Sequence, residues 1–505
     1  MKSYLRLSLA ALAIVIIAVV ALRWVRYSSP TVVQPTPVPT TGSEAPVAAT
    51  PKPQATPLPK LSGLPVDAAA SGGARWVSEV HVQNVGNEPT QISLTLYPAN
   101  GGPEQQTKAK TAAAGAAVIF RAGQDLPSGF SGSAVVNSTS QAVRAVVLWQ
   151  DANGRARSTY AASPPSQGRI DLPLVKRAWQ DSDTTLFVQN AGSEPTKVRI
   201  QFVPAGDGQP QTFEDDTPLA PGRSRAYTAP ESLGSFLGSA IISANPPAPL
   251  AVSYRELAKN GRMYSGAGLD PGWQGTELSA PVVRKQWLGS SSTIYVQNAG
   301  EKPAKVSVTY KSYDTGKEYT SSIGSGKTIA PGAARAYAAD PVLPGDPKGR
   351  AGFRGSAVIT SDQPVAVLIL EETTGGSNGL AYAGVPKEAA SNQAVVPLVR
   401  AYWMGSETGI AVTNVGTAPT KVGIRYKSSI TGKEYPGPWG TGELLAAGAS
   451  RSYYLEPPMP DSIDGSGFIG AATITADQPI VVTYDEMFAE EDRDTIGGNG
   501  QNIYP

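Results

Sequence analysis

Residue types that could carry chemistry are few in this 505-residue chain. His81 is the only histidine, and there is no cysteine. A Ser-His-Asp triad would have to use this one imidazole, yet no Gly-x-Ser-x-Gly elbow accompanies it. The missing cysteines exclude disulfides, thiol nucleophiles and thiolate metal sites. We expect His81 to lie on the surface of a sheet, and we assign it no catalytic or metal-binding role.

Carboxylates follow the same strand in four similar segments: Asp151, Glu256, Glu371 with Glu372, and Asp485 with Glu486. Glycoside hydrolysis needs two carboxylates across one cleft, whereas recurrence once per segment favours a structural role. We expect these carboxylates to be exposed to solvent. The alternative is an interdomain contact, in which each accepts hydrogen bonds from a neighbouring loop or pairs with basic residues near the start of a segment. The available basic residues include Lys176 and Arg177, and Arg284 and Lys285.

The densest acidic cluster lies near the carboxyl end and contains Asp485, Glu486, Glu490, Glu491, Asp492 and Asp494. Carboxylate oxygens suit Ca²⁺, but this spacing does not match an EF-hand loop. We therefore interpret the cluster as a solvated loop. The sequence predicts no metal, no cofactor and no catalytic residue.

Four tryptophans open the four segments: Trp76, Trp179, Trp287 and Trp403. Exposed tryptophans would stack on sugars, as in carbohydrate-binding modules. Their repetition at the start of each segment instead favours a structural plug at a domain end or at the boundary between neighbouring domains.

Behind these residues lies a repeat of roughly a hundred residues, whose period indicates tandem domains. Its central motif is Val82-Gln83-Asn84-Val85-Gly86, Val188-Gln189-Asn190-Ala191-Gly192, Val296-Gln297-Asn298-Ala299-Gly300 and Val412-Thr413-Asn414-Val415-Gly416. A small-residue motif follows it, at Gly132-Ser133-Ala134, Gly238-Ser239-Ala240, Gly355-Ser356-Ala357 and Gly470-Ala471-Ala472. The Asn-x-Gly motif, which leads to a proline, predicts a turn between strands, and the small residues predict close packing or a bulge.

Period-two alternation predicts half-buried antiparallel strands. In the second repeat, Leu186 and Val188 alternate with Phe187 and Gln189, and the next strand places Val198, Ile200 and Phe202 on one face. About seven strands per repeat predict an all-β chain of four β-sandwich domains. Their expected bounds are 62–168, 169–275, 276–391 and 392–505. We expect the first strand of repeat 1 to be weak or missing and the short connections to produce a semi-rigid rod.

The amino-terminal residues 1–27 are typical of a signal anchor. Lys2 and Arg6 precede an apolar run over residues 7–22, which we expect to enter the membrane as a transmembrane helix. Cleavage after Ala21 is the alternative. Residues 28–61 are rich in proline and threonine and predict an extended stalk.

The strand count and the Asn-x-Gly-x-x-Pro hairpins resemble the Ig-like β-sandwich repeats of bacterial cell-surface proteins, of the CARDB and DUF11-like kind. The resemblance covers about residues 62–505. It implies a non-enzymatic, extracytoplasmic structural or adhesion protein on the cell surface or in the periplasm. Its partner would be a protein, a second copy of the chain or a surface polysaccharide. An accessory subunit of a larger membrane complex and an array of carbohydrate-binding modules remain alternatives. A net charge of +1 argues against nucleic acid as a partner.

Overall fold

The computed structural model describes residues 61–67, 76–151, 157–206, 208–338, 340–345, 352–373, 379–403, 405–438, 440–454 and 467–488. Within this part of the chain the fold is all-β, as predicted, and the strands are antiparallel. Three short 3₁₀ turns accompany them: η1 (Glu231–Leu233), η2 (Pro271–Trp273) and η3 (Lys387–Ala389).

The expected membrane segment at residues 7–22 and the stalk that follows it lie outside the described residues. In the ranges that the structure describes, no helix has the length and apolar character needed to cross a membrane.

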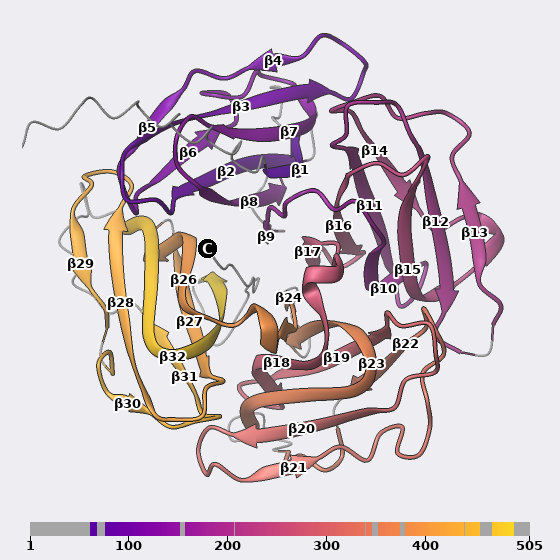
Figure 1. The fold of residues 1–505 in the computed structure, drawn as a ribbon, viewed down its shortest axis with the longest axis vertical. Helices are drawn as coiled ribbons and strands as arrows, with labels where there is room; N and C mark the ends of the chain where they lie inside the picture. The colour runs from indigo at the N-terminus through magenta and orange to yellow at the C-terminus, as the bar shows by residue number, and fades with distance from the viewer. Residues whose placement is uncertain are drawn as a thin grey trace, which may run out of the picture. The chain divides into compact units, whose positions relative to one another are not determined.

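Repeats 1 and 2 each consist of two separate sheets. Repeat 1 contains β1 (Leu61–Asp67), β2 (Trp76–Asn84), β3 (Thr90–Pro98), β4 (Gln105–Gln106), β5 (Lys110–Ala112), β6 (Ala117–Arg121), β7 (Ser131–Ser138), β8 (Val143–Asp151) and β9 (Arg157–Ala161). Repeat 2 contains β10 (Ile170–Arg177), β11 (Ser182–Asn190), β12 (Lys197–Pro204), β13 (Gln211–Glu214), β14 (Ser224–Thr228), β15 (Phe236–Asn245), β16 (Leu250–Ala258) and β17 (Met263–Ala267). The sheets of repeat 2 have the orders β10-β15-β12-β13 and β14-β11-β16-β17, and those of repeat 1 match them (Figure 1).

In repeats 3 and 4 one long strand passes from the first sheet into the second. Repeat 3 contains β18 (Gln274–Lys285), β19 (Ser290–Asn298), β20 (Val306–Ser312), β21 (Glu318–Thr320), β22 (Ala334–Ala338), β23 (Phe353–Thr373), β24 (Gly379–Ala383) and β25 (Val385–Pro386). Repeat 4 contains β26 (Ser391–Ala401), β27 (Ser406–Asn414), β28 (Thr420–Ser428), β29 (Glu434–Pro436), β30 (Leu444–Leu445), β31 (Ser450–Tyr454) and β32 (Phe468–Phe488). The first half of β23 pairs with β18 and β20 and its second half with β19 and β24, so one 21-residue strand replaces two shorter ones.

The first strand of repeat 1 is present, so the expectation that it is weak or missing was wrong. Leu61 to Asp67 pairs with β7, and Leu61, Leu64 and Val66 are buried. A Gly- and Ala-rich stretch follows the strand in the sequence, but the three apolar side chains suffice to hold it against the core.

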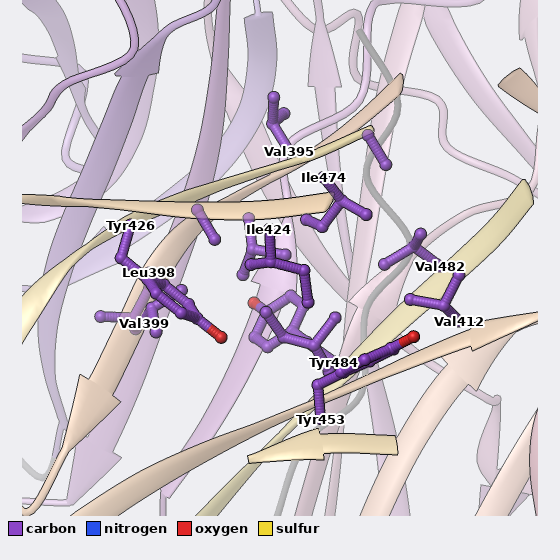
Figure 2. Close-up of a cluster of buried hydrophobic side chains, with 14 of the residues drawn as sticks. Val395, Leu398, Val399, Val412, Ile424, Tyr426, Tyr453, Ile474, Val482 and Tyr484 are labelled. Atoms are coloured by element: carbon purple, nitrogen blue, oxygen red, sulfur yellow. The ribbon is translucent and has the colours of Figure 1, made fainter. Parts of the chain in front are cut away.

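The alternation read from the sequence correctly predicts each core. Leu186, Val188, Val198 and Ile200 have no exposed surface, and Phe202 has almost none. The same positions carry apolar side chains in repeat 4, where Ile424, Tyr426 and Val412 pack with Leu398 and Tyr484 (Figure 2). Period-two patterning therefore determines which face of each strand packs between the two sheets.

Each core extends into a neighbouring repeat. Met263 of repeat 2 packs into the core of repeat 1, Leu368 of repeat 3 into that of repeat 2, and Ala411 of repeat 4 into that of repeat 3. The core of repeat 4 includes Ile119 and Val146 of repeat 1.

These contacts contradict the linear rod. A rod has no contact between its first and last units, but here repeat 4 packs against repeat 1 as well as against repeat 3. The contacts between repeats therefore form a closed cycle. The sequence indicated short, apolar connections, but connection length alone leaves the angle between successive domains undefined.

Candidate functional site: the seams between repeats

The asparagine of the repeated motif closes a turn within its own domain. Asn190 Nδ2 donates to the carbonyl oxygens of Glu194 at 2.8 Å and Leu219 at 2.7 Å, while Oδ1 accepts from the Gly192 N–H at 2.9 Å. The same three bonds recur around Asn84, Asn298 and Asn414. The predicted turn role is confirmed, and these asparagines are structural.

The glutamine before that asparagine crosses to the preceding repeat. Gln189 Nε2 donates to Gly222 O at 2.7 Å and to Ser133 Oγ of repeat 1 at 3.2 Å. Gln297 bonds Gly332 O and, in repeat 2, Ala240 O at 3.3 Å. Gln83 bonds Ala472 O of repeat 4 at 3.3 Å. A glutamine at the same position of its repeat therefore makes the contact at each of three seams. The sequence did not predict this role, because strand alternation shows only that the position faces away from the core of its own repeat.

The small-residue motif supplies the other side of these seams. Ser133 Oγ donates to Gly222 O at 3.2 Å, and Ser239 Oγ donates to Gly332 O at 2.7 Å. A Cβ atom at Gly238 would lie 2.2 Å from Val203 O, and the opposite strand bulges between Leu172 and Val175. The prediction of close packing or a bulge is confirmed on both counts.

The seam between repeats 3 and 4 lacks the glutamine, because Thr413 occupies that position. Thr413 Oγ1 bonds Ser450 Oγ at 2.7 Å inside repeat 4. The buried guanidinium of Arg284 in repeat 3 instead lies 3.8 Å from Asp485 of repeat 4. Burial raises the pKa of Asp485 to about 6, against the opposing effect of Arg284.

The recurring carboxylates belong to buried ion pairs. Glu256 lies 2.7 Å from Lys176, Glu371 binds Arg284, and Glu486 lies 3.4 Å from Arg400. The expected solvent exposure was therefore wrong for these three residues, and the alternative, pairing with a basic residue near the start of the repeat, holds, although each pair lies within one repeat. Burial raises the pKa of Glu256 although Lys176 opposes the shift, as expected for a carboxylate removed from water.

The remaining carboxylates singled out in the sequence have different positions. Glu372 of repeat 3 lies 2.8 Å from Arg262 of repeat 2. Of the predicted acidic cluster, Asp485 and Glu486 are buried on β32, so the interpretation as a solvated loop was wrong for them, and the four later residues lie outside the described ranges. Within the described ranges, no three acidic or histidine side chains are grouped as a metal ion would require.

Repeat 1 replaces the buried ion pair with aromatic rings. By strand register Asp67 corresponds to Lys176 and Trp149 to Glu256. The guanidinium of Arg255, from repeat 2, lies 4.5 Å from the ring centroid of Trp76 and 5.0 Å from that of Trp149. A cation facing two rings stabilises this seam by cation–π attraction.

The expected structural role of the tryptophans holds for Trp76. It is buried in the core of repeat 1 and faces the seam with repeat 2. Trp179, Trp287 and Trp403 are half-buried, and the ring of Trp287 is faced by Arg354 at 4.5 Å.

His81 is fully buried, although its position was expected to be a sheet surface. The side chain does face away from its own core, but repeat 4 covers it, and its Nε2 lies 3.2 Å from Glu79 Oε2. Burial lowers the pKa of His81. Burial alone would raise the pKa of Glu79, but His81, Arg400 and Arg121 outweigh this effect and lower the pKa to about 2.

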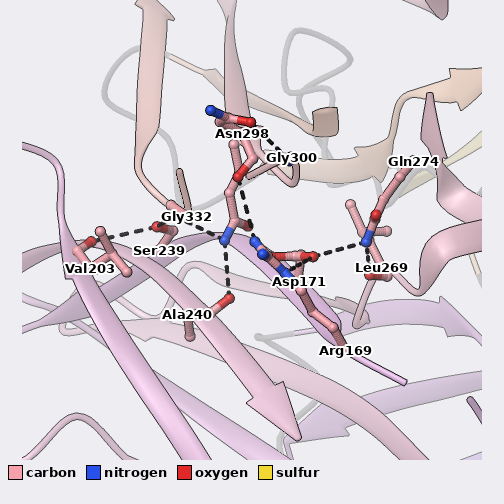
Figure 3. Close-up of polar contacts among 11 residues, drawn as sticks. Arg169, Asp171, Val203, Ser239, Ala240, Leu269, Gln274, Asn298, Gly300 and Gly332 are labelled. Atoms are coloured by element: carbon pink, nitrogen blue, oxygen red, sulfur yellow. Dashed lines mark hydrogen bonds and ion pairs between the residues drawn. The ribbon is translucent and has the colours of Figure 1, made fainter. Parts of the chain in front are cut away.

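A second polar cluster joins repeats 2 and 3 beside the glutamine contact. Arg169 binds Asp171 at 2.6 Å, and Gln274 Nε2 donates to the same carboxylate at 2.8 Å (Figure 3). Arg169 also reaches Asn298 O at 3.4 Å. Arg169 thus neutralises the buried charge of Asp171, and the Gln274 amide adds a hydrogen bond to it.

A groove of about 520 Å³ lies at the seam between repeats 3 and 4. Repeat 3 contributes Trp287, Tyr313 and Arg354, and repeat 4 contributes Leu444 and Tyr454. Leu444 is 63% exposed and Tyr454 is 41% exposed. These contributions make it a surface site formed jointly by two repeats.

The chain matches no model of a known protein family, and a search of curated proteins finds no relative for it.

Proposed function

We propose that the protein is a non-enzymatic, membrane-anchored structural or adhesion protein, which presents four joined β-sandwiches outside the cytoplasm. The proposal rests on the observation that the recurring polar side chains form structural hydrogen bonds and ion pairs. Gln189 and its counterparts Gln83 and Gln297 bond across seams, whereas Glu256, Glu371 and Glu486 form ion pairs within their own repeats, so these side chains hold the β-sandwiches and the joints between them together. Residues 7–22 would anchor the assembly, and residues 28–61 would hold it away from the membrane.

Joined domains suit presentation of a binding surface. Interfaces between domains of one chain normally permit relative motion unless they are large and apolar. Here apolar cores continue through the seams, and buried ion pairs lie beside them. A surface formed by two repeats would therefore keep its shape without its partner, which lowers the ordering cost of binding.

Fractionation of native cells tests location and assembly together. Protein recovered from the envelope in mild detergent, with its mass and co-purifying components determined by mass spectrometry, supports the proposal. Its globular part should also be digested by protease added to the extracytoplasmic side. Recovery in the cytoplasmic fraction, protected from that protease, would overturn the proposal.

A role as accessory subunit of a larger envelope complex is the second candidate. Among the described residues, six of the seven large exposed hydrophobic side chains belong to repeats 3 and 4: Leu288, Val358, Tyr402, Ile430, Leu444 and Tyr454. Exposed apolar side chains that lie together mark interaction surfaces, and Leu444 and Tyr454 of this set line one groove. Stoichiometric recovery with another membrane protein would favour this candidate over self-supporting adhesion.

A further inference from the structure

We propose that the groove between repeats 3 and 4 binds an extended peptide segment, which adds as a strand to the outer edge of β31. The inference rests on the proposed function, because it identifies the surface that the joined repeats present and the chemistry of its partner.

β31 provides an edge that a peptide can join. It is the last strand in the order β29-β28-β32-β27-β31, and within the described residues it pairs with β27 alone. Ser450, Ser452 and Tyr454 alternate along β31 with Arg451, and all four line the groove. Since residues of both faces line it, the groove follows the edge of the strand. An edge presents N–H and C=O groups that an extended backbone satisfies.

Polar and apolar groups both line the groove beside this edge. Its apolar residues include Leu444, Leu445, Ala446, Val282 and Ala449. Leu444 and Tyr454 are the most exposed large apolar side chains of the groove. Alternate side chains of an added strand would pack on these residues, since side chains of a strand alternate between its two faces.

The charges of the groove are already neutralised. Arg354 lies 2.7 Å from Asp314, Arg451 lies 3.1 Å from Glu443, and Arg284 binds Glu371. A charged ligand would have to compete with these pairs. The complementary partner is therefore a neutral peptide with apolar side chains.

The residues around this groove differ from those at the seam between repeats 2 and 3. By strand register and sequence position, the seam between repeats 2 and 3 places Ala205 where Tyr313 lies and Leu237 where Arg354 lies. Thr328 and Ala338 take the positions of Leu444 and Tyr454 there. Larger side chains thus surround the groove at the one seam where Thr413 replaces the glutamine.

A saccharide fits the groove less well than a peptide. Sugar platforms use exposed faces of aromatic rings, but Arg354 lies over Trp287, and the Tyr313 hydroxyl donates to the Pro281 carbonyl. Of the aromatic residues that line the groove, Tyr454 alone is more than a third exposed.

The test is selection from a phage library of short random peptides on the immobilised full-length chain. The variants Leu444→Asp and Tyr454→Asp place a charge in the groove. Ile430→Asp is the matched control, because Ile430 is an exposed apolar residue of the same repeat that does not line the groove. We expect the selected peptides to bind wild type and Ile430→Asp alike, and the two groove variants about tenfold more weakly or worse.

N-methylation of one backbone amide at a time in a selected peptide tests strand addition directly. Loss of binding at every second residue supports it, since alternate amides of an added strand point toward β31. Uniform tolerance of N-methylation would overturn the inference, as would equal binding to all three variants. Failure to select peptides, together with glycan binding that Tyr454→Asp abolishes, would also overturn it. Envelope location is measured separately by fractionation. Failure of the peptide test would therefore overturn this inference without overturning the proposed function.

Discussion

Single glycines determine how closely the repeats approach one another. Gly222 has a φ of 74°, a conformation that side chains with a Cβ disfavour. A Cβ atom there would also lie 2.2 Å from the ring of Tyr97 in repeat 1. The conformation and the close approach both require glycine, so this turn serves the seam as well as its own domain.

Replacing Gly222 with alanine should therefore destabilise the protein by about 2 to 4 kcal/mol, as strain in the turn adds to a clash across the seam. The midpoint of urea unfolding measures the effect. Gly261→Ala is the matched control, because Gly261 has a φ of 92° and open space around its Cβ position. It should cost only about 1 to 2 kcal/mol. Equal losses in the two variants would show that the Tyr97 contact contributes nothing.

The buried carboxylate of Asp485, at the seam between repeats 3 and 4, should make the stability of the protein depend on pH. Its pKa is about 6 in the folded protein, against an ordinary value of 3.8 that the unfolded chain would show. The folded state therefore binds more protons between these values, and this group's contribution to stability falls as pH rises from about 4 to 6. Asp485→Asn should remove that dependence and raise stability above pH 6 by about 1 to 3 kcal/mol.

Thermal unfolding of wild type and Asp485→Asn at a series of pH values from 4 to 8 makes the comparison. Similar midpoints near pH 4 and a higher midpoint for the variant near pH 8 are expected. A variant less stable than wild type at pH 8 would mean that attraction to Arg284 outweighs the cost of burial.

At the scale of elements, strands of the two sheets together position the buried ion pair of repeat 2. Lys176 lies on β10 and Glu256 on β16, in different sheets of repeat 2, and both side chains are buried. The backbone N–H of Lys176 donates to Thr184 Oγ1 at 2.9 Å, and the backbone N–H of Arg284 and of Arg400 makes the matching bond. This recurring bond fixes the basic side chain opposite its carboxylate.

Lys176→Met should cost about 3 to 5 kcal/mol, because it leaves Glu256 buried without its partner. The double variant Lys176→Met/Glu256→Leu should recover most of that loss, since it removes both charges. Lys259→Met serves as the control, because it breaks an exposed pair with Asp181 and should leave the unfolding midpoint unchanged. A double variant as unstable as the single one would show that packing at this position matters more than charge.

The strand pattern of the sequence predicted much of the fold of each repeat, but it did not predict how the repeats are placed against one another. Leu186 and Val188 are core residues because alternation reflects local geometry, which the sequence states directly. Gln189 and His81 are buried by a different repeat, and nothing in their own strands indicates that cover. Lys176 and Glu256 stood out because a basic and an acidic residue recur at these places, but their ion pair lies within repeat 2 and marks no seam.

On the scale of the whole repeat region, closure changes what the tandem domains can do. A linear array leaves its terminal domains with one neighbour each. In this protein each repeat contacts two others, so every core is covered on both sides. The seams are not identical, however. The contact between repeats 3 and 4 lacks the glutamine and contains the groove, so specialisation within the repeats lies there.

Cross-linking tests the closure itself. Lys427 Nζ of repeat 4 donates to Ala114 O of repeat 1 at 2.8 Å, and the natural chain has no cysteine that would interfere. The variant Ala114→Cys/Lys427→Cys, treated with a short bismaleimide at low protein concentration, should give an intramolecular product in high yield. Peptide mapping identifies the linked pair.

Ala114→Cys/Lys259→Cys is the control for non-specific reaction. Lys259 directly follows β16 in repeat 2 and pairs with Asp181 of the same repeat. A linear rod would hold residues 114 and 427 two domains apart, so the two variants would react equally poorly. Efficient linkage in the first variant alone is expected, since only closure brings the first and fourth repeats together within one chain.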